Sequence, residues 1–575
     1  MIFTVDNVVE KNLPKIHQTP WLATPTKAML RYLLNEKQCN DIAAEFAYLK
    51  GVDFVEHVLD CFDFNYSVPS NEIENIPIDG RVVIYANHPI GSLDALALIK
   101  LISQVRPDIK VVANELLMAL EPLHSLLLPV NNMSGGTPRQ HLENIHLHLK
   151  NEGAVLIFPS GEVSRLRPSG VTDLKWHSGF LKMANSCNAP LLPMFVDAKN
   201  SLSFYGASMI YKPLASLLLV KEMFKQQKRT MPVRIGQLIP KEAITGHDFN
   251  VKTKVQLLKN HLYRIGKNRR PLFATQKAIA HPESRSELQS ALQQCEMLGE
   301  TNDNKQIFLY QHQGCNPIMR EIGRLREIAF RAVGEGSGNR RDNDQYDPYY
   351  QHLVLWDKDD LEIVGSYRFA SAKWVHEHQG KTALYSQSLF QYNDEFAPYF
   401  ENGLELGRSF VQPKYWGKRS LDYLWLGIGA YLAKNPQFRY LFGPVSISDQ
   451  IPEQAKEMLV HFYQQQFSNP EVLAISNCPY RFTQDKRQQL DALYSADDYA
   501  SNFKVLKHTM ANMGAAVPPL FKQYGELCEQ NGVSFLDFGI DTDFGNCIDG
   551  LVLVDVHALK PKKQQRYINY HLTKP

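Results

Sequence analysis

A chain of 575 residues is too long for a single hydrophobic core, so we expect two or three domains. With 44% hydrophobic and 21% charged residues, the composition excludes an intrinsically disordered protein. The net charge is only +2, and the eight cysteines show neither C-x-x-C spacing nor a zinc pattern, which indicates idle thiols in a reducing compartment and predicts no metal site.

The first residues, MIFTVDNVVEKNLP, lack the layout of a signal peptide, and no window reaches the ~18 uninterrupted apolar residues that cross a bilayer. We therefore expect a peripheral protein on the cytoplasmic face of the inner membrane. Residues 199–277 hold 16 Lys and Arg against 3 Asp and Glu, around the apolar segment 208–220. An anionic membrane would attract such a segment by ~1 kcal/mol per basic residue. A solvated basic face is the alternative. Nucleic acid is disfavoured because no binding motif is present.

The first half predicts an α/β domain. Residues 1–79 read as an amino-terminal helical region, and from residue 80 to 270 strand-like runs alternate with helical ones. Strands are expected at VVIYA, IKVVAN, AVLIFPS and APLLPMFV, and helices at residues 95–102, 116–120 and 180–186. Residues 271–305 read as a linker that holds one helix, 284–298, and the polar run GETNDN.

The second half, residues 306–575, predicts a separate α+β domain. Strands are expected at IFLYQ, HLVLWD, EIVGSYRFA, LELGRSFVQP and YLFGPVSI, and helices at residues 317–333, 420–434 and 453–466.

A polar turn separates a buried strand from a helix in VVIYANHPIGSLDALAL. His88 and Asp94 flank this turn, and the carboxyl ends of parallel strands are where α/β folds place their chemistry. An Asp beside a His can hold one ring nitrogen as N–H and leave the other free to take a proton. The alternative is an Asn-Pro turn followed by an Asp that only caps the helix.

The blocks NHPIGSLD, IFPSGEVSR and PLLP resemble those of the PlsC-like glycerolipid acyltransferases, over about residues 82–196. The resemblance implies that His88 is the general base toward an acceptor hydroxyl and that Asp94 orients it. It also implies a set of residues that bind the polar headgroup: Asn87, Gly161, Glu162, Ser164 and Arg165. Five residues rather than four separate His88 from Asp94, and Ser160 stands where the family has Glu. We expect the turn to absorb the extra residue and Glu162 to replace the missing acid in part.

The element order after residue 306 resembles the GNAT N-acyltransferase fold. ELGRSFVQP, LDYLWLGIGAY, LFGPVSIS and MREIGRLREIAFR resemble the ornithine lipid N-acyltransferases, relatives of the acyl-homoserine-lactone synthases. The resemblance implies that Glu405 binds or deprotonates the amine and that Arg408 anchors a carboxylate or the donor. A cross-strand ion pair is the alternative for these two residues. Asp541 and Asp543 are expected near the substrate.

The acyl donor is expected to bind at Gly417, Lys418, Arg419 and Ser420, before a helix. Arg419 replaces the second Gly of the usual donor loop, so an acyl carrier protein fits better than coenzyme A. Three arginines on the helix at 317–333 are candidates for carrier docking, with exposed solubility as the alternative: Arg320, Arg324 and Arg326.

Together the resemblances imply a bifunctional ornithine lipid synthase. Its second half would N-acylate ornithine with a 3-hydroxyacyl thioester, and its first half would O-acylate the lyso-lipid, with acyl carrier protein or coenzyme A as carrier of the co-substrate and no bound cofactor. Glycine, lysine or another amine is the alternative acceptor. A lysophospholipid acyltransferase and a haemolysin-like membrane factor with decayed sites are the alternatives of another kind.

Overall fold

The computed structural model describes residues 5–6, 10, 20–33, 35–46, 48–130, 138–168, 170–210, 212–246, 248–494 and 499–570. The chain folds into two compact units, Met1–Ala278 and Ile279–Pro575.

The first unit is built on a seven-stranded sheet with the strand order β1-β9-β8-β2-β5-β3-β4. All neighbouring strands are parallel except β8 and β9. β2 is buried at every residue, as the apolar run VVIYA predicts for a central parallel strand. The strands are β1 (Asn65–Ser67), β2 (Val82–Ala86), β3 (Lys110–Asn114), β4 (Leu127–Val130), β5 (Ala154–Ile157), β8 (Leu191–Val196) and β9 (Thr230–Ile235), with a separate hairpin of β6 (Arg165–Arg167) and β7 (Gly170–Thr172).

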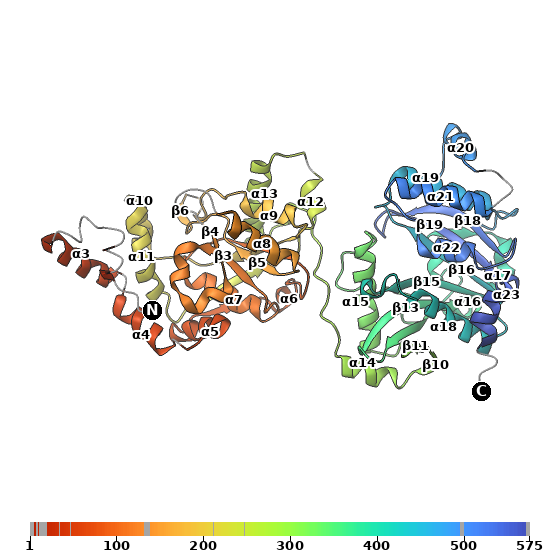
Figure 1. Ribbon diagram of the computed structural model, residues 1–575, viewed down its shortest axis with the longest axis horizontal. Coiled ribbons are helices and arrows are strands. Elements are labelled where there is room, and N and C mark those ends of the chain that lie inside the picture. The colour runs from red at the N-terminus through yellow and green to blue at the C-terminus, as the bar shows by residue number, and fades with distance from the viewer. Residues whose placement is uncertain are drawn as a thin grey trace. The chain divides into compact units, whose positions relative to one another are not determined.

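Helices cover both faces of this sheet, which confirms the α/β prediction. α5 and α7 pack on one face, and α8, α9 and α13 on the other (Figure 1). The helical elements are α3 (Pro20–Leu33), α4 (Glu36–Glu45), α5 (Gly51–Cys61), α6 (Ser70–Ile73), α7 (Leu93–Ser103), η1 (Glu115–Ala119), η2 (Glu121–Leu126), α8 (Arg139–Lys150), α9 (Gly179–Ser186), α10 (Leu202–Ile210), α11 (Lys212–Phe224), α12 (Lys241–Thr245) and α13 (Val251–Ile265).

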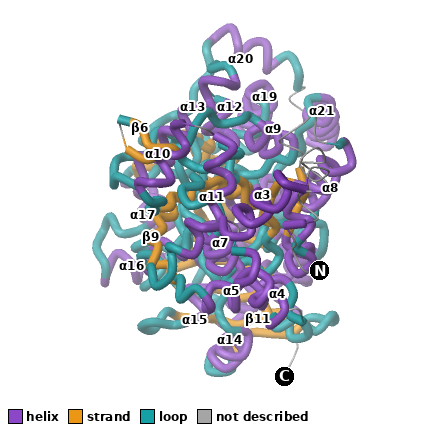
Figure 2. The backbone as a smooth tube through the Cα atoms, turned by 90° about the vertical axis from the view of Figure 1, so that its left-hand side faces the viewer, coloured by secondary structure: helices purple, strands orange, loops and turns teal. Residues whose placement is uncertain are grey.

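The expected amino-terminal region, residues 1–79, is in part integral to this unit. β1 pairs with β9, and Phe54, Val55 and Leu59 of α5 lie in the same core as α7. α3 lies alongside α11 (Figure 2), where Lys221 Nζ is 3.0 Å from the Tyr32 hydroxyl.

The expected membrane segment comprises residues 208–220, and the structure describes only part of it. The side chains of residues 208–217 lie outside the described residues. None of the helices in the described ranges combines the length and the hydropathy that a bilayer crossing requires.

The second unit has an eight-stranded sheet with the order β10-β11-β12-β13-β15-β16-β19-β18. Only β15 and β16 are parallel neighbours. The strands are β10 (Glu296–Glu300), β11 (Lys305–Gln311), β12 (Gln351–Asp357), β13 (Glu362–Ser371), β15 (Gly403–Val411), β16 (Tyr440–Ile447), β18 (Val533–Asp541) and β19 (Cys547–Asp555), with a small sheet of β14 (Phe390–Tyr392) and β17 (Ala474–Ser476).

Two groups of helices cover this second sheet. α14 and α15 pack on one face, and α18, α19, α21 and α22 on the other. The helical elements are α14 (Arg285–Leu292), α15 (Pro317–Ala332), α16 (Ala372–His378), η3 (Tyr385–Ser388), η4 (Asp394–Phe396), α17 (Ala397–Glu401), η5 (Pro413–Tyr415), α18 (Ser420–Lys434), α19 (Glu453–Gln466), α20 (Gln484–Asp491), α21 (Tyr499–Asn512), α22 (Pro519–Gly525), η6 (Val556–Ala558), α23 (Pro561–Gln564) and η7 (Gln565–Asn569).

Most of the expected linker, residues 271–305, is folded into this second unit. The sequence predicted one helix over 284–298, but α14 ends at Leu292 and residues 296–300 form β10. β10 pairs antiparallel with β11 at the sheet edge. Pairing satisfies the backbone of this run as a strand, and that tertiary contact overrides its local helical pattern.

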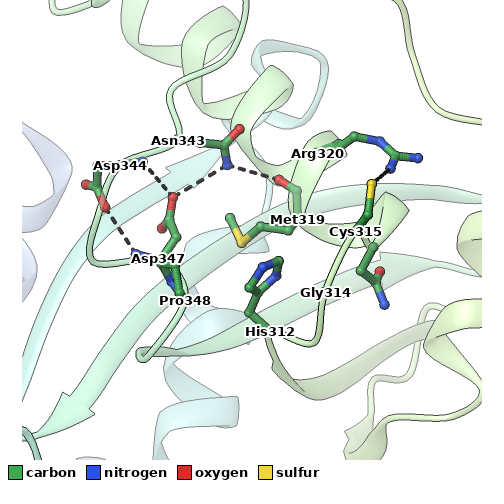
Figure 3. Close-up of a pocket in the computed structure, with 10 residues that line it drawn as sticks. His312, Gly314, Cys315, Met319, Arg320, Asn343, Asp344, Asp347 and Pro348 are labelled. Atoms are coloured by element: carbon green, nitrogen blue, oxygen red, sulfur yellow. Dashed lines mark hydrogen bonds between the residues drawn. The ribbon is translucent and has the colours of Figure 1, made fainter. Parts of the chain in front are cut away.

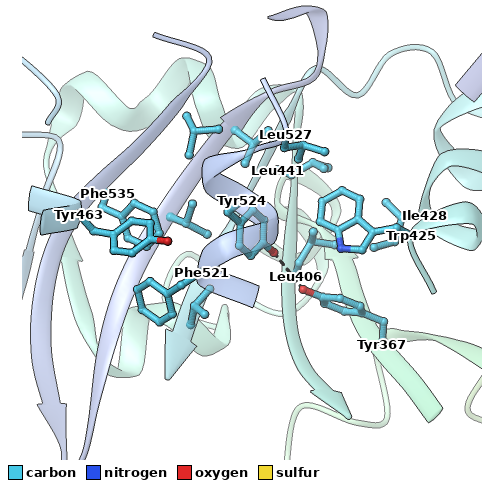
Figure 4. Close-up of a cluster of buried hydrophobic side chains, with 14 of the residues drawn as sticks. Tyr367, Leu406, Trp425, Ile428, Leu441, Tyr463, Phe521, Tyr524, Leu527 and Phe535 are labelled. Carbon is cyan, nitrogen blue, oxygen red and sulfur yellow. Dashed lines mark hydrogen bonds between the residues drawn. The ribbon is translucent and has the colours of Figure 1, made fainter. Parts of the chain in front are cut away.

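The strand that carries the second site is fixed by a core on one of its faces. Leu404 and Leu406 of β15 are buried with Trp425 of α18, and the hydroxyls of Tyr367 and Tyr524 lie 2.9 Å apart in the same cluster (Figure 4). Because side chains alternate along a strand, residue 405 points to the opposite face.

Candidate active sites

His88 and Asp94 form a pair at the turn between β2 and α7. His88 Nδ1 lies 3.1 Å from Asp94 Oδ2, and Asp94 is fully buried. The contact is close but not aligned as a hydrogen bond, which is common for catalytic pairs without substrate. The other ring nitrogen, Nε2, makes no hydrogen bond within the described residues, and the side chain is 18% exposed. The imidazole therefore faces a carboxylate on one side and is open on the other.

The turn absorbs the extra residue between His88 and Asp94 by wrapping around the carboxylate. Gly91 has a φ of +90°, and a Cβ there would lie 2.5 Å from the Val163 side chain. Asp94 therefore closes the turn and also faces the imidazole, so the two roles weighed from the sequence belong to one side chain. Four backbone N–H groups donate to its carboxylate at 2.9 to 3.3 Å, those of Ile90, Gly91, Ser92 and Ala95.

Burial and charge together set the protonation of the pair. Burial lowers the pKa of His88, but the Asp94 carboxylate and the charge of Asp173 together outweigh burial, and the pKa lies above its ordinary value. Burial raises the pKa of Asp94, yet the His88 charge and the N–H groups of the turn hold that pKa below its ordinary value. Phe158 stacks on the imidazole with ring centroids 4.2 Å apart. A fixed imidazole of raised pKa is a suitable base for a hydroxyl proton.

The block IFPSGEVSR brings polar groups to the same turn. Gly161 has a φ of +63°, and Gly161 and Glu162 are exposed. Ser164 is buried, and its N–H donates to the His88 carbonyl at 2.9 Å. Nε and Nη1 of Arg165 are buried, and no residue that the structure describes accepts a hydrogen bond from them. A buried guanidinium without an acceptor can bind an anion.

One sequence expectation for this site needs correction. Asn87 exchanges two hydrogen bonds of 2.8 Å with the backbone of Val196, so its amide ties the turn to β8 rather than extending to the open side. Glu162 is exposed, and its part in replacing the missing acid stays a prediction. Besides Asp94, a second carboxylate lies next to His88, that of Asp173, which accepts a hydrogen bond from the His88 backbone N–H at 3.3 Å. In the sequence, Asp173 is one lone acid within VTDLKW.

In the second unit, β15 and β16 separate after three paired residues. Gly403 to Glu405 pair with Tyr440 to Phe442, and both strands then run on without pairing to each other, β15 to Val411 and β16 to Ile447. A gap of this kind between the central strands is where the GNAT fold is expected to receive the thioester donor.

Glu405 lies at the point where the two strands separate. It is 1% exposed, and its carboxylate accepts hydrogen bonds from the backbone N–H of Ser386 at 2.6 Å, from that of Tyr385 at 3.1 Å and from the Tyr350 hydroxyl. Burial raises the pKa of Glu405, although these hydrogen bonds oppose the shift. No ion pair joins Glu405 to Arg408 in the described part of the chain, so the cross-strand pair weighed from the sequence is absent there. A buried carboxylate of raised pKa suits a general base.

Arg408 lies in a β-bulge, where two residues of β15 oppose Tyr367 of β13. Its φ of +47° is in the left-handed region, which costs a non-glycine residue of order 1–2 kcal/mol. The bulge turns the side chain to the face of Glu405, because the guanidinium lies 5.2 Å from the ring of Tyr385. Bulges and strained residues cluster at functional sites.

The Arg408 guanidinium is buried without good hydrogen bonds. Nε and Nη1 donate to no described residue, and the nearest carboxylates are Asp342 at 3.5 Å and Asp344 at 3.6 Å. The ring of Phe544 lies 4.5 Å from the guanidinium. Arg408 thus has donor capacity left for a ligand carboxylate.

Behind Arg408 lies a network of buried ion pairs that the sequence did not predict. Arg368 is 1% exposed and contacts Asp344 at 2.5 Å and Asp347 at 2.9 Å. Arg326 is fully buried and contacts Asp347 at 2.7 Å. Arg326 is therefore neither a solvated nor a docking residue, contrary to the sequence expectation. Arg320 and Arg324 are held by acids as well, Glu283 at 2.7 Å and Glu321 at 2.6 Å.

Three buried carboxylates are affected by the charge of Arg408, and we call them the acid group: Glu335, Asp541 and Asp549. Glu335 accepts a hydrogen bond from the Ser446 hydroxyl at 3.0 Å, and Asp549 lies opposite Ser446 in the sheet. Burial raises the pKa of Glu335 to about 7. Burial and the charges of its two neighbours hold the pKa of Asp549 well above its ordinary range. Asp541 was expected at the site and Glu335 and Asp549 were not, while Asp543 is exposed.

The expected donor loop leads into α18. Gly417 has a φ of +76°, which favours glycine, and Lys418 and Arg419 are exposed. Ser420 begins the helix, is 1% exposed, and its hydroxyl donates to no described residue. The loop thus presents two cations at a helix amino terminus, where phosphate groups bind.

A cavity of about 220 Å³ lies beside the start of α15 (Figure 3). Asp344 and Asp347 line it. Arg368, Arg326 and neighbouring N–H groups donate to Asp347 and to Oδ1 of Asp344, and Oδ2 of Asp344 lies 3.6 Å from Arg408 Nε. The cavity therefore borders the network of ion pairs.

Each unit has the fold and the polar groups of an acyl-transfer enzyme. Residues 10–268 match the family model described as acyltransferase, and residues 325–426 match the one described as acetyltransferase (GNAT) domain. The chain is therefore an acyltransferase, with a PlsC-like α/β domain followed by a GNAT domain.

Three curated relatives indicate the kinds of acyltransferase that the chain resembles. A glycine N(alpha)-acyltransferase of Bacteroides thetaiotaomicron is 31% identical over 303 residues, covering 50% of this chain and 89% of the relative. A lyso-glycine lipid O-acyltransferase of Phocaeicola vulgatus is 26% identical, with 41% of this chain and 86% of the relative covered. An L-ornithine N(alpha)-acyltransferase of Brucella abortus is 27% identical, with 44% and 84% covered. The chain belongs to the acyltransferase family of the Bacteroides thetaiotaomicron protein.

Proposed function

We propose that this chain makes an aminolipid of the ornithine type by two consecutive acyl transfers. The GNAT domain forms an amide between a 3-hydroxyacyl thioester and the α-amine, and the PlsC-like domain then forms an ester on the 3-hydroxyl. The observation that carries the proposal is the presence of both sites in one chain, the His88–Asp94 pair at the end of β2 and the buried Glu405 at the strand gap. The names of the relatives, two N-acyltransferases and a lyso-lipid O-acyltransferase, support it.

The ester is formed by base-assisted attack on a thioester. His88 Nε2 takes the proton of the lyso-lipid hydroxyl while that oxygen attacks the thioester carbonyl, and the proton then passes to the leaving thiolate. Asp94 stabilises the imidazolium that forms in between. Arg165, with its buried and unaccepted N–H groups, binds the carboxylate of the amino-acid headgroup.

The amide requires a neutral amine, which is why the second site needs a base. Glu405 takes the proton of the α-ammonium, the free amine attacks the thioester, and the thiol leaves. Arg408 binds the α-carboxylate of the acceptor with the donors that the described residues leave unused. The raised pKa of Glu405 supports its role, since burial brings this carboxyl closer to the pH at which it must accept a proton.

The charge of the acid group supports ornithine as the acceptor. Its carboxylates repel one another, and Arg408 is the cation that lowers the pKa of each of them. A side-chain ammonium such as that of ornithine would neutralise this group, whereas glycine has no such charge. Glycine remains the second candidate because the 31% identical relative acts on it by name.

The donor is proposed to be an acyl carrier protein. Lys418 and Arg419 are exposed beside the strand gap, as a basic docking rim requires, and Arg419 stands where a second Gly would widen a coenzyme A cradle. The basic segment 199–277 is proposed to keep the chain at an anionic membrane, where the lyso-lipid stays. A tethered second site meets that intermediate at a raised effective concentration.

Lipid extracts of a host expressing the gene test the proposal. The wild-type chain should yield a new ninhydrin-positive diacyl lipid, and mass spectrometry identifies its amino acid. His88→Ala should accumulate the mono-acylated lyso-lipid, because loss of the base slows esterification by ~10²- to 10⁴-fold. Glu405→Gln should abolish both lipids.

His124→Ala is a matched control, because this exposed histidine hydrogen-bonds to the Met118 carbonyl and belongs to neither proposed site, so its loss should leave the product unchanged. A full yield of diacyl lipid from His88→Ala would overturn the assignment of the first domain. Cell lysis without any new lipid would favour a haemolysin-like factor, and a diacyl glycine lipid would favour the second candidate.

A further inference from the structure

Asp173 is a second buried carboxylate near His88, and its partners come from several segments of the chain. It follows β7 directly and is fully buried. Its Oδ1 accepts hydrogen bonds from the Ser164 hydroxyl at 2.5 Å and from the His88 backbone N–H at 3.3 Å, and its Oδ2 accepts one from Trp176 Nε1 at 2.9 Å. One side chain thus links two sequence blocks, the NHPIGSLD turn and the IFPSGEVSR turn.

The backbone of Asp173 is itself held by α13. Its N–H donates to the Tyr263 hydroxyl at 2.8 Å, and its carbonyl accepts from Lys259 Nζ at 2.7 Å. The Ser164 N–H closes the loop by donating to the His88 carbonyl at 2.9 Å. Asp173 and Ser164 therefore hold the backbone N–H and the carbonyl of His88. Because side-chain direction depends on the backbone, these contacts also fix the direction of the imidazole.

The charged groups around Asp173 define its electrostatic role. The cations near Asp173 and its neighbours on α13 are His88, Lys259 and Arg167. Tyr263 is the other titratable group there. Burial raises the pKa of Asp173, and the hydrogen bonds to its carboxylate, which all come from donors, oppose that shift and favour the anionic form. The imidazole accordingly experiences two carboxylates, Asp94 at its ring and Asp173 at its backbone, and both raise the pKa of His88.

We propose that Asp173 is a positioning residue of the O-acyltransferase site: it clamps the His88 and Ser164 turns together and supplies a second negative charge to the imidazolium formed during proton transfer. This inference rests on the proposed esterification. It differs from the role of Asp94, which contacts the imidazole directly. No substrate or donor contact is assigned to Asp173.

The test is Asp173→Asn in the full chain, assayed with lyso-lipid and acyl thioester over a range of pH. The kcat of esterification should fall by up to about 100-fold, because small displacements of a base cost that much, while KM for the lyso-lipid stays within a few-fold. The acidic limb of the kcat profile should move to lower pH, since one of the two charges that favour imidazolium is gone. Amide formation by the same molecules should not change.

Two variants separate positioning from simple damage to the fold. Asp108→Asn removes another hydrogen-bonded carboxylate of the first unit, which binds Arg106 and the Ala154 N–H, and should leave the pH profile of esterification in place. Trp176→Phe keeps an aromatic ring against Phe180 but removes the donor to Asp173, and should show a smaller loss of kcat. Asp173→Glu should recover part of the pH shift.

The titration of His88, followed by NMR with isotope-labelled histidine and assigned with His88→Gln, gives a readout that does not depend on turnover. A lower pKa in Asp173→Asn is the expected result. An unchanged His88 titration and an unchanged kcat would overturn the inference. Failure of the wild-type chain to esterify any lyso-lipid would instead overturn the proposed function.

Discussion

Replacing Glu335 by Gln probes the charge balance of the second site. Glu335 is 5% exposed, and burial raises its pKa from 4.5 to about 7. At ~1.4 kcal/mol for each pKa unit, ionised Glu335 costs the fold about 3 kcal/mol. Between these two values the folded chain keeps the proton that the unfolded chain has lost. Folding therefore takes up a proton, and the free energy of unfolding falls as the pH rises through the window, then levels off above about 7.

Gln mimics the protonated form, so the variant should lose this pH dependence. Denaturant unfolding of the full chain, read at the transition of the second unit, should give similar stability for both proteins at about pH 5. At about pH 8.5 the variant should be more stable by up to about 3 kcal/mol. Glu327→Gln is the matched control. Glu327 is buried in the same unit but paired with Arg331 at 2.6 Å, so this variant should be destabilised at both pH values.

Added ornithine extends the same measurement to binding. A side-chain ammonium at the acid group would favour ionised Glu335, so ornithine should stabilise the wild-type chain more at high pH than at low pH, and glycine should not. Equal pH dependence of wild-type and Glu335→Gln unfolding would refute the electrostatic reasoning. Equal effects of ornithine and glycine would refute the assignment of the acceptor.

Two further predictions concern the backbone of the first site and the anchor of the second. Gly91→Ala should destabilise the first unit by ~1–3 kcal/mol, because the φ of +90° is unfavourable for Ala and its Cβ would clash with Val163. Thermal unfolding measures this loss of stability. Full stability together with an intact yield of ester would contradict the prediction. Arg408→Lys keeps the charge but loses the planar fork, so KM for the amino acid should rise about 10-fold or more in initial-rate assays of amide formation, and an unchanged KM would argue that Arg408 does not bind the carboxylate.

Local patterns in the sequence predicted the elements that are determined locally. The apolar run VVIYA, the polar turn and the apolar helix placed His88 and Asp94 at a strand end, and outside residues 271–305 the expected strands and helices occur in the expected order. The acyltransferase class also followed from the short blocks. These features depend on residues close together in the chain, so their periodicity and turn chemistry are sufficient.

The partners brought in from distant segments could not be read in this way. Asp173 reaches His88 only because the β6–β7 hairpin folds back, and Arg368 meets Asp347 across a sheet whose register is set by packing. The sequence indicated that Arg326 is a surface cation on a helix. It is buried instead, because acids from a later loop neutralise its charge. The exposure of Glu162 likewise depends on how its segment folds and could not be read from the spacing of residues in the sequence.

The turn between β18 and β19 has a consequence for how acceptor choice could change among such enzymes. It begins at Asp541 and ends at Cys547, and it carries Phe544 against the Arg408 guanidinium. The exposed residues of this short turn, 542–543 and 545–546, tolerate exchange at little entropic cost, whereas buried Phe544 and the arginines and aspartates beneath it do not. Exchanging this turn between homologues would therefore change the surroundings of the Arg408 guanidinium and leave the buried ion pairs intact.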